Sequence, residues 1–371
     1  MSNNAGTRVI VGMSGGVDSS VAALLLKQQG YDVHGLYMFN WDEDEQGYCT
    51  AAEDFQDARR VASLLDIPLH QVNFAAEYRQ HVFDVFLEGL QAGLTPNPDV
   101  LCNREIKFGR FLDHALRLGA SYVATGHYAR RISVNGEHQL HRGADRSKDQ
   151  SYFLHYVSAE ALGRTLFPLG ETLKSDVRAL ALEAGLHNSR KRDSTGICFI
   201  GERPFQEFLA SYLPVQPGEI RTPEGQAVGE HCGLAFYTLG QRQGLGIGGV
   251  RGASDEPWYV AGKDDDNNVL IVVQGHDHPL LYSSSLEATA VHWINGCPAA
   301  GELSCQVSTR YRQRPAPAAA RLAAGTAHVE FASPQWAVTP GQHAVFYDGE
   351  RCLGGGIISA AAATGVLQTA V

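Results

Sequence analysis

The sequence lacks the long apolar runs of membrane-spanning proteins. No stretch of its 371 residues approaches the roughly 20 apolar residues that a membrane-spanning helix needs. The N-terminal MSNNAGTRVIVG has no apolar signal-peptide segment before its first predicted strand. We therefore expect a cytoplasmic protein that does not contact membranes.

Paired cysteines and an excess of positive charge are also missing. The seven cysteines are scattered without a Cys-x-x-Cys pair, which argues against a zinc ribbon or a disulfide framework. The formal net charge of −10 argues against a protein that coats nucleic acid indiscriminately. Basic residues nevertheless cluster at four places, each of which alone is typical of a solvated surface: Arg130-Arg131, Arg142 with Arg146 and Lys148, Arg190-Lys191-Arg192, and Arg310 with Arg312 and Arg314.

The length predicts two or three domains. Residues 1–203 alternate short β-rich runs with helical periods, which indicates an α/β domain with a parallel, doubly wound sheet. Strands are predicted at 9–12, 33–39, 69–74 and 121–125, and helices at 17–29, 51–65, 77–90 and 105–118. The glycine-rich residues 204–277 predict a small central domain, and residues 278–371 predict an antiparallel β-barrel in which 315–320 form a loop.

A glycine-rich loop, SGGVDSS at residues 14–20, directly follows the first predicted strand. A strand that enters a helix through such a turn leaves backbone N–H groups unpaired at the positive end of the helix dipole, which favours phosphate. A Walker loop needs a lysine here, and none is present. The loop instead resembles the PP-loop of the ATP pyrophosphatases, which holds pyrophosphate while AMP is transferred to an oxygen of a second substrate.

Two further motifs contain cysteine. In TPNPDVLCN, residues 95–103, two prolines predict a rigid turn that presents Asn97, Asp99 and Cys102 together. In KRDSTGICFI, residues 191–200, Cys198 follows a basic patch that favours the reactive thiolate. Spacing along the chain does not show whether the two thiols meet, and a buried packing role is the alternative for each.

These motifs occur in order with ATGHYAR, KDQSYFL, HCGLAFYTLGQRQGLGIGG, STRYRQ and HAVFYDGE over nearly the whole chain. Together they resemble the bacterial tRNA-specific 2-thiouridylase family. The resemblance implies a PP-loop, HUP-like catalytic domain followed by a small central domain and a tRNA-contacting barrel. It implies a tRNA-uridine 2-sulfurtransferase that uses ATP and Mg²⁺ to convert the wobble uridine, U34, of the lysine, glutamate and glutamine tRNAs to 2-thiouridine.

The resemblance also assigns roles to residues. Cys198 would carry a persulfide, Cys102 would be the nucleophilic second thiol, and Asp99 would act as general acid/base. Either the persulfide attacks C2 itself, or Cys102 attacks the persulfide and frees hydrosulfide, leaving a Cys102–Cys198 disulfide. Sulfur would come from relay proteins loaded by a cysteine desulfurase, and a monomer is the default expectation.

The implied contacts fall into three sets. ATP would be contacted by Gly12, Met13, Ser14, Gly15, Gly16, Val17, Asp18, Ser19, Met38 and Gly126. The target base would meet Asn97, Pro98 and Asp99, and the rest of the tRNA would meet Lys148, Asp149, Gln150, Arg310 and Tyr311. No dedicated metal site is implied, although Asp18 is a candidate Mg²⁺ ligand.

Two alternatives stay open at this point. Another PP-loop adenylating ligase, similar to argininosuccinate or GMP synthetase, would need no paired thiols. A non-catalytic ATP-binding protein would bind nucleotide without releasing pyrophosphate.

Overall fold

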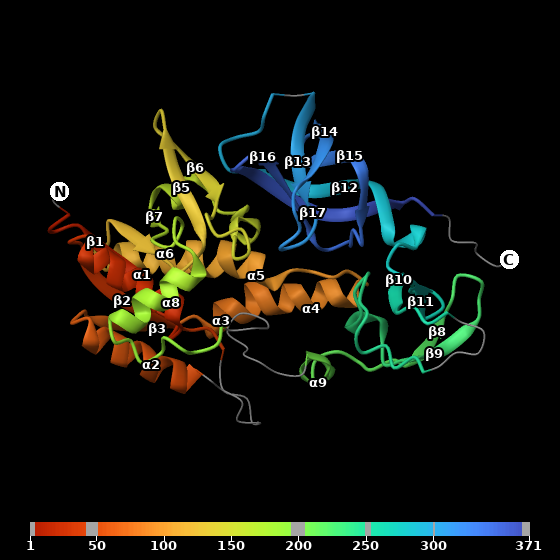
Figure 1. The fold of residues 1–371 in the computed structure, drawn as a ribbon, viewed down its shortest axis with the longest axis horizontal. Coiled ribbons are helices and arrows are strands. Elements are labelled where there is room, and N and C mark those ends of the chain that lie inside the picture. Colours follow the sequence, from red (N-terminus) through yellow and green to blue (C-terminus); the bar gives the residue numbers. More distant parts are fainter. Residues whose placement is uncertain (1–3, 42–50, 194–204, 249–253, 300, 366–371) are drawn as a thin grey trace.

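The computed structural model describes residues 4–41, 51–193, 205–248, 254–299 and 301–365. Figure 1 shows an α/β unit, a small sheet and a β-barrel. The α/β unit is built on a parallel five-stranded sheet in the order β3-β2-β1-β4-β7. Its strands are β1 (Arg8–Gly12), β2 (Asp32–Phe39), β3 (Leu69–Asn73), β4 (Tyr122–Ala124) and β7 (Thr165–Leu166). The predicted parallel sheet is therefore confirmed, with β1 between β2 and β4.

Helices cover both faces of this sheet because β1 is apolar on both sides, as expected of a buried parallel strand. Val9 and Val11 belong to one core cluster with residues of α1 (Val17–Gln28), α2 (Ala51–Leu64) and α8 (Lys174–Glu183). Ile10 belongs to the cluster on the other face, with residues of α6 (Phe111–Arg117). The sheet is thus doubly wound. In such sheets ligands bind at the carboxyl ends of the strands, and we call this side of the sheet its open edge.

Two of the predicted helices contain π-helical segments. The first helical region consists of α3 (Ala75–Tyr78), η1 (Arg79–Phe83) and α4 (Asp84–Gln91), and α4 extends under the barrel toward the small sheet (Figure 1). The second consists of α5 (Pro98–Leu101), η2 (Cys102–Arg110) and α6. π-Helical turns occur frequently at functional sites, and η2 begins at the predicted nucleophile.

The small sheet has the order β10-β11-β8-β9. It comprises β8 (Gly218–Arg221), β9 (Ala227–His231), β10 (Trp258–Asp264) and β11 (Val269–Gln274), and follows α9 (Phe205–Ala210). Buried residues of this sheet, such as Val260 and Leu270, belong to the same core cluster as Phe83 of η1. The small sheet is therefore packed onto the α/β unit through the long helical region.

The C-terminal barrel is closed. Its strands run antiparallel in the order β12-β15-β14-β13-β16-β17, and β12 also pairs with β17. They are β12 (Tyr282–Trp293), β13 (Glu302–Ser308), β14 (Ala316–Ala323), β15 (Thr326–Trp336), β16 (His343–Asp348) and β17 (Arg351–Ala363). The expected loop at 315–320 is wrong, because most of it belongs to β14. Ala316, Ala318 and Ala320 are buried there, as small interior residues of a narrow barrel.

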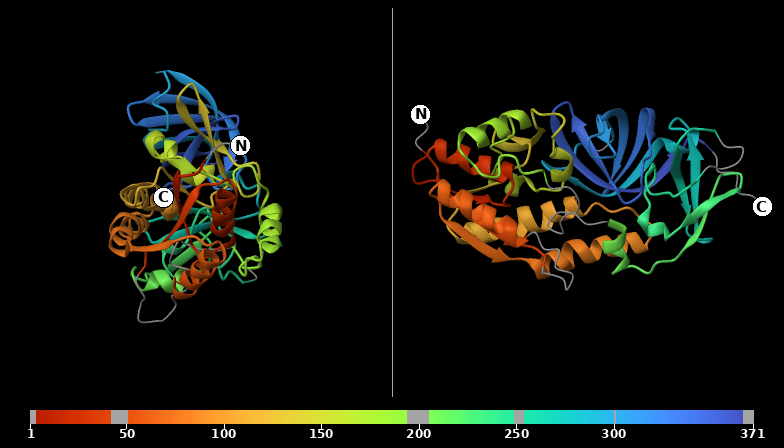
Figure 2. Two further views of the ribbon diagram at one scale, coloured as in Figure 1. Left: turned by 90° about the vertical axis from the view of Figure 1, so that its left-hand side faces the viewer. Right: turned by 60° about the horizontal axis from the view of Figure 1, so that its bottom comes forward.

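The hairpin of β5 (Ala129–Val134) and β6 (Glu137–Arg142) joins the barrel rather than the parallel sheet. Arg351 and Cys352 of β17 pair with His141 and Leu140 of β6. Figure 2 shows the barrel between this hairpin and the small sheet. No helix within the described ranges is both long and apolar enough to cross a membrane.

Candidate active site and nucleic-acid interface

The glycine-rich loop connects β1 to α1 at the open edge of the parallel sheet. Gly15 has a φ of +75°, and a Cβ there would lie 2.3 Å from the backbone oxygen of Asp54, so only glycine fits. Gly16, the N-cap of α1, has no side chain to bond the N–H groups of the first turn. Met13 is buried and Ser14 is exposed. The loop therefore presents mainly backbone to a ligand, as the sequence predicts.

Parallel strands bring two other predicted nucleotide contacts to the same edge. Met38 lies near the end of β2, and Gly126 follows β4 on the opposite side of β1. A Cβ on Gly126 would lie 2.9 Å from both the carbonyl carbon of Asp18 and the backbone nitrogen of Ser19. Gly126 is thus required for the close approach of its own loop to the start of α1.

A chain of ion pairs links the glycine-rich loop at residues 14–20, the predicted phosphate loop, to helix α8. The Lys174 ammonium donates to both carboxylate oxygens of Asp18 at 2.8 Å and contacts Asp193 at 2.7 Å. The Tyr128 hydroxyl also donates to Asp18, at 2.8 Å. Burial, followed by the charge of Asp18, raises the pKa of Tyr128 well above its usual value, so the hydroxyl keeps its proton. Nothing in the sequence indicated Lys174, because the residues it contacts are distant along the chain.

The segment that precedes Cys198 is tied to the same loop. Asn188 donates to the backbone oxygen of Gly15 at 3.0 Å and to the Ser20 hydroxyl at 2.9 Å. Lys191 pairs with Asp54 and Asp57. Residues 187–193 therefore form one side of the candidate nucleotide site. Cys198 itself lies outside the described residues.

The proline-rich loop positions the other predicted catalytic residues. The Asn97 side-chain oxygen accepts from the backbone N–H of Asp99 at 3.2 Å and of Val100 at 3.4 Å, which caps α5 at Pro98. This cap fixes the backbone of Asp99, and Cys102 follows at the end of α5. The Cys102 side chain is fully buried. The rigid turn expected from the two prolines is therefore present, and it is reinforced by a cap.

The barrel holds this loop from the other side. Gln342 donates to the backbone oxygen of Thr95 at 2.7 Å, and its own side-chain oxygen lies 3.5 Å from the Asn97 amide nitrogen. The backbone N–H of Thr95 donates to the Pro340 carbonyl at 3.0 Å. Sequence reasoning missed Gln342, because no local pattern relates it to a loop more than 200 residues away.

The cysteines in the described ranges are all free thiols: Cys102, Cys232, Cys297, Cys305 and Cys352. The possible Cys102–Cys198 disulfide involves a residue outside these ranges. Within the same ranges, no group of three or more histidine, cysteine, aspartate or glutamate side chains could hold a metal ion.

The predicted tRNA contacts in the first domain make internal contacts. Lys148 pairs with Asp193 at 2.8 Å, and Gln150 accepts from the backbone N–H of Tyr128 at 3.0 Å. The Asp149 side chain is only 8% exposed and pairs with Arg142 at 2.8 Å. Asp149 is thus placed to orient Arg142 and the neighbouring backbone rather than to meet a phosphate.

In the barrel, Tyr311 packs on Phe153 with ring centres 4.4 Å apart. Arg310 donates to the backbone oxygens of Leu239 and Ala337 and to the Thr339 hydroxyl. These bonds fix the guanidinium between the central domain and the barrel, which sequence reasoning did not anticipate.

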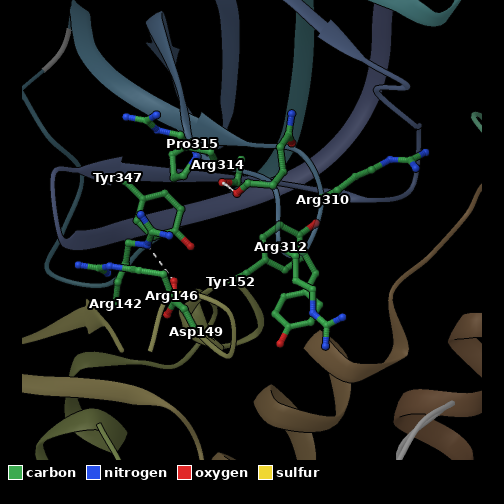
Figure 3. A pocket seen from close by; sticks show the side chains of 12 residues that line it. Arg142, Arg146, Asp149, Tyr152, Arg310, Arg312, Arg314, Pro315 and Tyr347 are labelled. Atoms are coloured by element: carbon green, nitrogen blue, oxygen red, sulfur yellow. Dashed lines mark hydrogen bonds and ion pairs between the residues drawn. The ribbon is translucent and has the colours of Figure 1, made fainter. Parts of the chain in front are cut away.

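Two of the basic clusters meet at one cavity of about 420 Å³ between the β5–β6 hairpin and the barrel (Figure 3). Arg142 and Arg146 line it from the hairpin side, and Arg310, Arg312 and Arg314 line it from the barrel side. Glu350 pairs with Arg146, whereas no carboxylate in the described ranges pairs with Arg312 or Arg314. The cavity is therefore cationic in a chain whose net charge is −10.

Comparison with known proteins covers nearly the whole chain. Residues 7–202 match the profile of the tRNA methyl transferase HUP domain, residues 206–274 that of the tRNA methyl transferase PRC-barrel domain, and residues 283–358 that of the aminomethyltransferase β-barrel domain. The tRNA-specific 2-thiouridylase MnmA of Nitrosomonas eutropha is 61% identical over 355 residues, which cover 95% of this chain and 98% of that protein. The protein of the same name from Cupriavidus metallidurans is 59% identical over 356 residues, covering 95% and 99%. On this evidence the chain belongs to the tRNA-specific 2-thiouridylase family.

Proposed function

We propose that the protein replaces the C2 oxygen of the wobble uridine of tRNA with sulfur, using ATP to activate that oxygen. The observation that carries the proposal is the shared sheet edge. There the phosphate loop, Gly126 and the segment leading to Cys198 are joined by direct contacts. Relatives that align over 95% of this chain are named for this activity.

ATP is the first substrate. Its phosphates would lie against the backbone of residues 12–19, where Gly15 and Gly16 permit close approach. Met38 and Gly126 would border the rest of the nucleotide. Asp18 would hold Mg²⁺, which neutralises phosphate charge, and its carboxylate fits because it is an oxygen ligand that is still 30% exposed.

The chemistry follows from the poor leaving ability of an oxygen at C2. We propose that this oxygen attacks the α-phosphate of ATP, which releases pyrophosphate and leaves AMP on the base. In the direct route, the terminal sulfur of the Cys198 persulfide then attacks C2 and AMP leaves with the oxygen. Cys102 next attacks the Cys198 sulfur, which frees 2-thiouridine and leaves a Cys102–Cys198 disulfide that an external thiol reduces.

In the second route, Cys102 attacks the persulfide first and releases hydrosulfide, which then displaces AMP. Both routes require the Cys102 thiol to be accessible, and in this structure it is fully buried. Binding of tRNA against the residue 95–103 loop would therefore have to uncover it. Asp99 is proposed to shuttle the proton of the pyrimidine edge.

The substrate base must leave the anticodon stack, which costs a few kcal/mol and least in a loop. The cationic cavity is proposed to help by binding phosphates beside the target nucleotide. Arg312 and Arg314 are the best placed, since no carboxylate in the described ranges neutralises them. Sulfur is proposed to reach Cys198 from a relay protein served by a cysteine desulfurase.

The test is mass spectrometry of nucleosides from unmodified tRNA after incubation with the protein, ATP, Mg²⁺ and a persulfide donor. We expect 2-thiouridine, one AMP and one pyrophosphate per turnover. Cys102→Ser and Cys198→Ser should abolish 2-thiouridine, whereas Cys297→Ser, at an exposed cysteine, is the matched control that retains it. Pyrophosphate release at the wild-type rate by both active-site variants, with no 2-thiouridine formed by any of the proteins, would favour a PP-loop ligase instead. Nucleotide binding without pyrophosphate release would favour a non-catalytic ATP-binding protein.

A further inference from the structure

The phosphate loop has no lysine of its own, yet a lysine ammonium lies against it. Lys174 is the first residue of α8, and it is only 9% exposed. Lysines are almost never this buried without a partner. Its position therefore calls for an explanation beyond helix packing.

The three donors of the ammonium are occupied. Both oxygens of Asp18 lie 2.8 Å from the Lys174 nitrogen, and one oxygen of Asp193 lies 2.7 Å from it. An ammonium has three N–H groups, so these three acceptors saturate it. Any further anion at this position has to replace one of the carboxylate oxygens.

Asp18 is the partner that can give way. Its carboxylate also accepts from the Tyr128 hydroxyl at 2.8 Å, so it stays hydrogen-bonded when Lys174 moves off one of its oxygens. Asp18 belongs to the first turn of α1, beside the backbone that is proposed to hold the phosphates. The Asp18 carboxylate therefore connects the Lys174 ammonium to that part of the loop.

We propose that Lys174 is a phosphate-binding residue of the nucleotide site, supplying from α8 the cation that the loop itself lacks. The inference rests on the proposed use of ATP. Binding would exchange one Asp18 oxygen for a phosphate oxygen, while Lys174 keeps its contact with Asp193. A lysine binds phosphate as a compact point charge, which tolerates such an exchange of partners.

The second partner of Lys174 is Asp193, which holds the ammonium from the segment that precedes Cys198. Asp193 lies five residues before Cys198 in the sequence and also pairs with Lys148 at 2.8 Å and with Arg178 at 3.0 Å. Burial raises the pKa of Asp193, but the hydrogen bonds from Lys148 and Lys174 outweigh it and lower that pKa to about 2. Asp193 therefore stays charged and holds Lys174 in place when Asp18 is released.

The structure also offers a matched control. Arg178 lies on the same helix four residues after Lys174 and pairs with the same Asp193. It also donates to the backbone oxygens of Ser189 and Lys191, but it has no contact with Asp18 in the described ranges. A variant at Arg178 therefore loosens Asp193 without removing a cation from the loop. If Lys174 acted only by holding Asp193, the two substitutions would have similar effects.

The experiment compares wild type, Lys174→Met, Lys174→Arg and Arg178→Met by calorimetric titration with ATP, adenosine and inorganic pyrophosphate, without tRNA. We expect Lys174→Met to weaken ATP and pyrophosphate binding about tenfold or more, the loss of one charge-assisted hydrogen bond. Adenosine affinity should not change. Lys174→Arg should restore part of the loss. Arg178→Met loosens the 189–193 segment but leaves the cation beside the loop, so it should weaken ATP binding clearly less than Lys174→Met does.

Three results would overturn the inference. Unchanged ATP and pyrophosphate binding by Lys174→Met would remove Lys174 from the phosphate site. If Lys174→Met weakened the binding of ATP and adenosine equally, or if Arg178→Met lost as much ATP affinity as Lys174→Met, the role of Lys174 would be structural. Thermal unfolding of each variant checks that it is folded. Wild-type protein that binds no ATP would overturn the proposed function as well, and is thereby distinguished from failure of Lys174 alone.

Discussion

The cap at Asn97 allows stability and catalysis to be separated. In Asn97→Ala, the backbone N–H groups of Asp99 and Val100 lose their acceptor. Losing an N-cap costs about 1 kcal/mol, within a range of about 0.5–2. The 3.5 Å contact with Gln342 is at the limit of a hydrogen bond and adds little. For a cooperative unit of about 200 residues, this corresponds to a fall in Tm of about 2–4 °C.

Such a loss barely changes the folded fraction, because proteins are stable by about 5–15 kcal/mol. The rate of thiolation should nevertheless fall more than about tenfold, since small displacements of positioned groups are costly to catalysis. Asn97→Asp is the matched variant: its carboxylate still caps α5, but it has no amide to donate to Gln342. We expect it to keep the Tm of wild type within about 1 °C, a fraction of the effect of losing a cap.

The assays are thermal unfolding by circular dichroism and single-turnover formation of 2-thiouridine by mass spectrometry. If Asn97→Ala unfolds at the wild-type temperature, the assignment of the cap is wrong. If it unfolds at a lower temperature but thiolates at the wild-type rate, the geometry of the loop does not limit the reaction.

Four other variants test further features of the structure. Gly126→Ala should weaken ATP binding about tenfold in calorimetry, because its Cβ would lie 2.9 Å from the loop backbone; unchanged affinity would refute this. Arg310→Ala should lower the free energy of unfolding by about 2 kcal/mol because the bonds to backbone carbonyls are lost, which denaturant titrations measure. Arg312→Ala should mainly reduce the salt slope of tRNA binding by about one, which filter binding at several salt concentrations measures. Burial lowers the pKa of His155 to about 3. As the pH falls below about 6.5, the imidazole therefore gains a proton only in the unfolded protein. The free energy of unfolding should then decrease by up to about 1.4 kcal/mol per pH unit. His155→Gln, unfolded in denaturant at pH 7 and pH 5, should lose that part of the dependence.

The local order of the first domain was predictable because its signals are short-range. The apolar residues 9–11 followed by a glycine-rich turn predict β1, the loop and α1. The observed β1 begins one residue earlier than predicted, and α1 ends one residue earlier. The β5–β6 hairpin also had a local signal, Asn135-Gly136, whose two positive φ angles suit a tight hairpin turn. Its pairing with β17 had none, since register between segments more than 200 residues apart depends on tertiary packing.

In the candidate site, too, local features were predictable from the sequence and long-range contacts were not. Motifs predicted which residues belong to the loop at 14–20 and to the turn at 95–103, but not what holds them. Lys174 reaches Asp18 across 156 positions, and Gln342 reaches Thr95 across 247. Neither contact leaves a pattern in the sequence, because a single polar side chain has no periodicity.

The barrel is consequently part of the proposed catalytic unit and not only a surface for tRNA. Gln342 and Pro340 hold the backbone of Thr95, two residues before the cap that fixes Asp99. The edge of β17 pairs with β6, and β6 ends at Arg142, whose guanidinium is oriented by Asp149. A change in the barrel can therefore displace the cationic cavity together with the 95–103 loop that is proposed to contact the base. Binding of tRNA phosphates to the barrel would in this way be coupled mechanically to the loop that leads into Cys102, some 200 residues earlier in the chain.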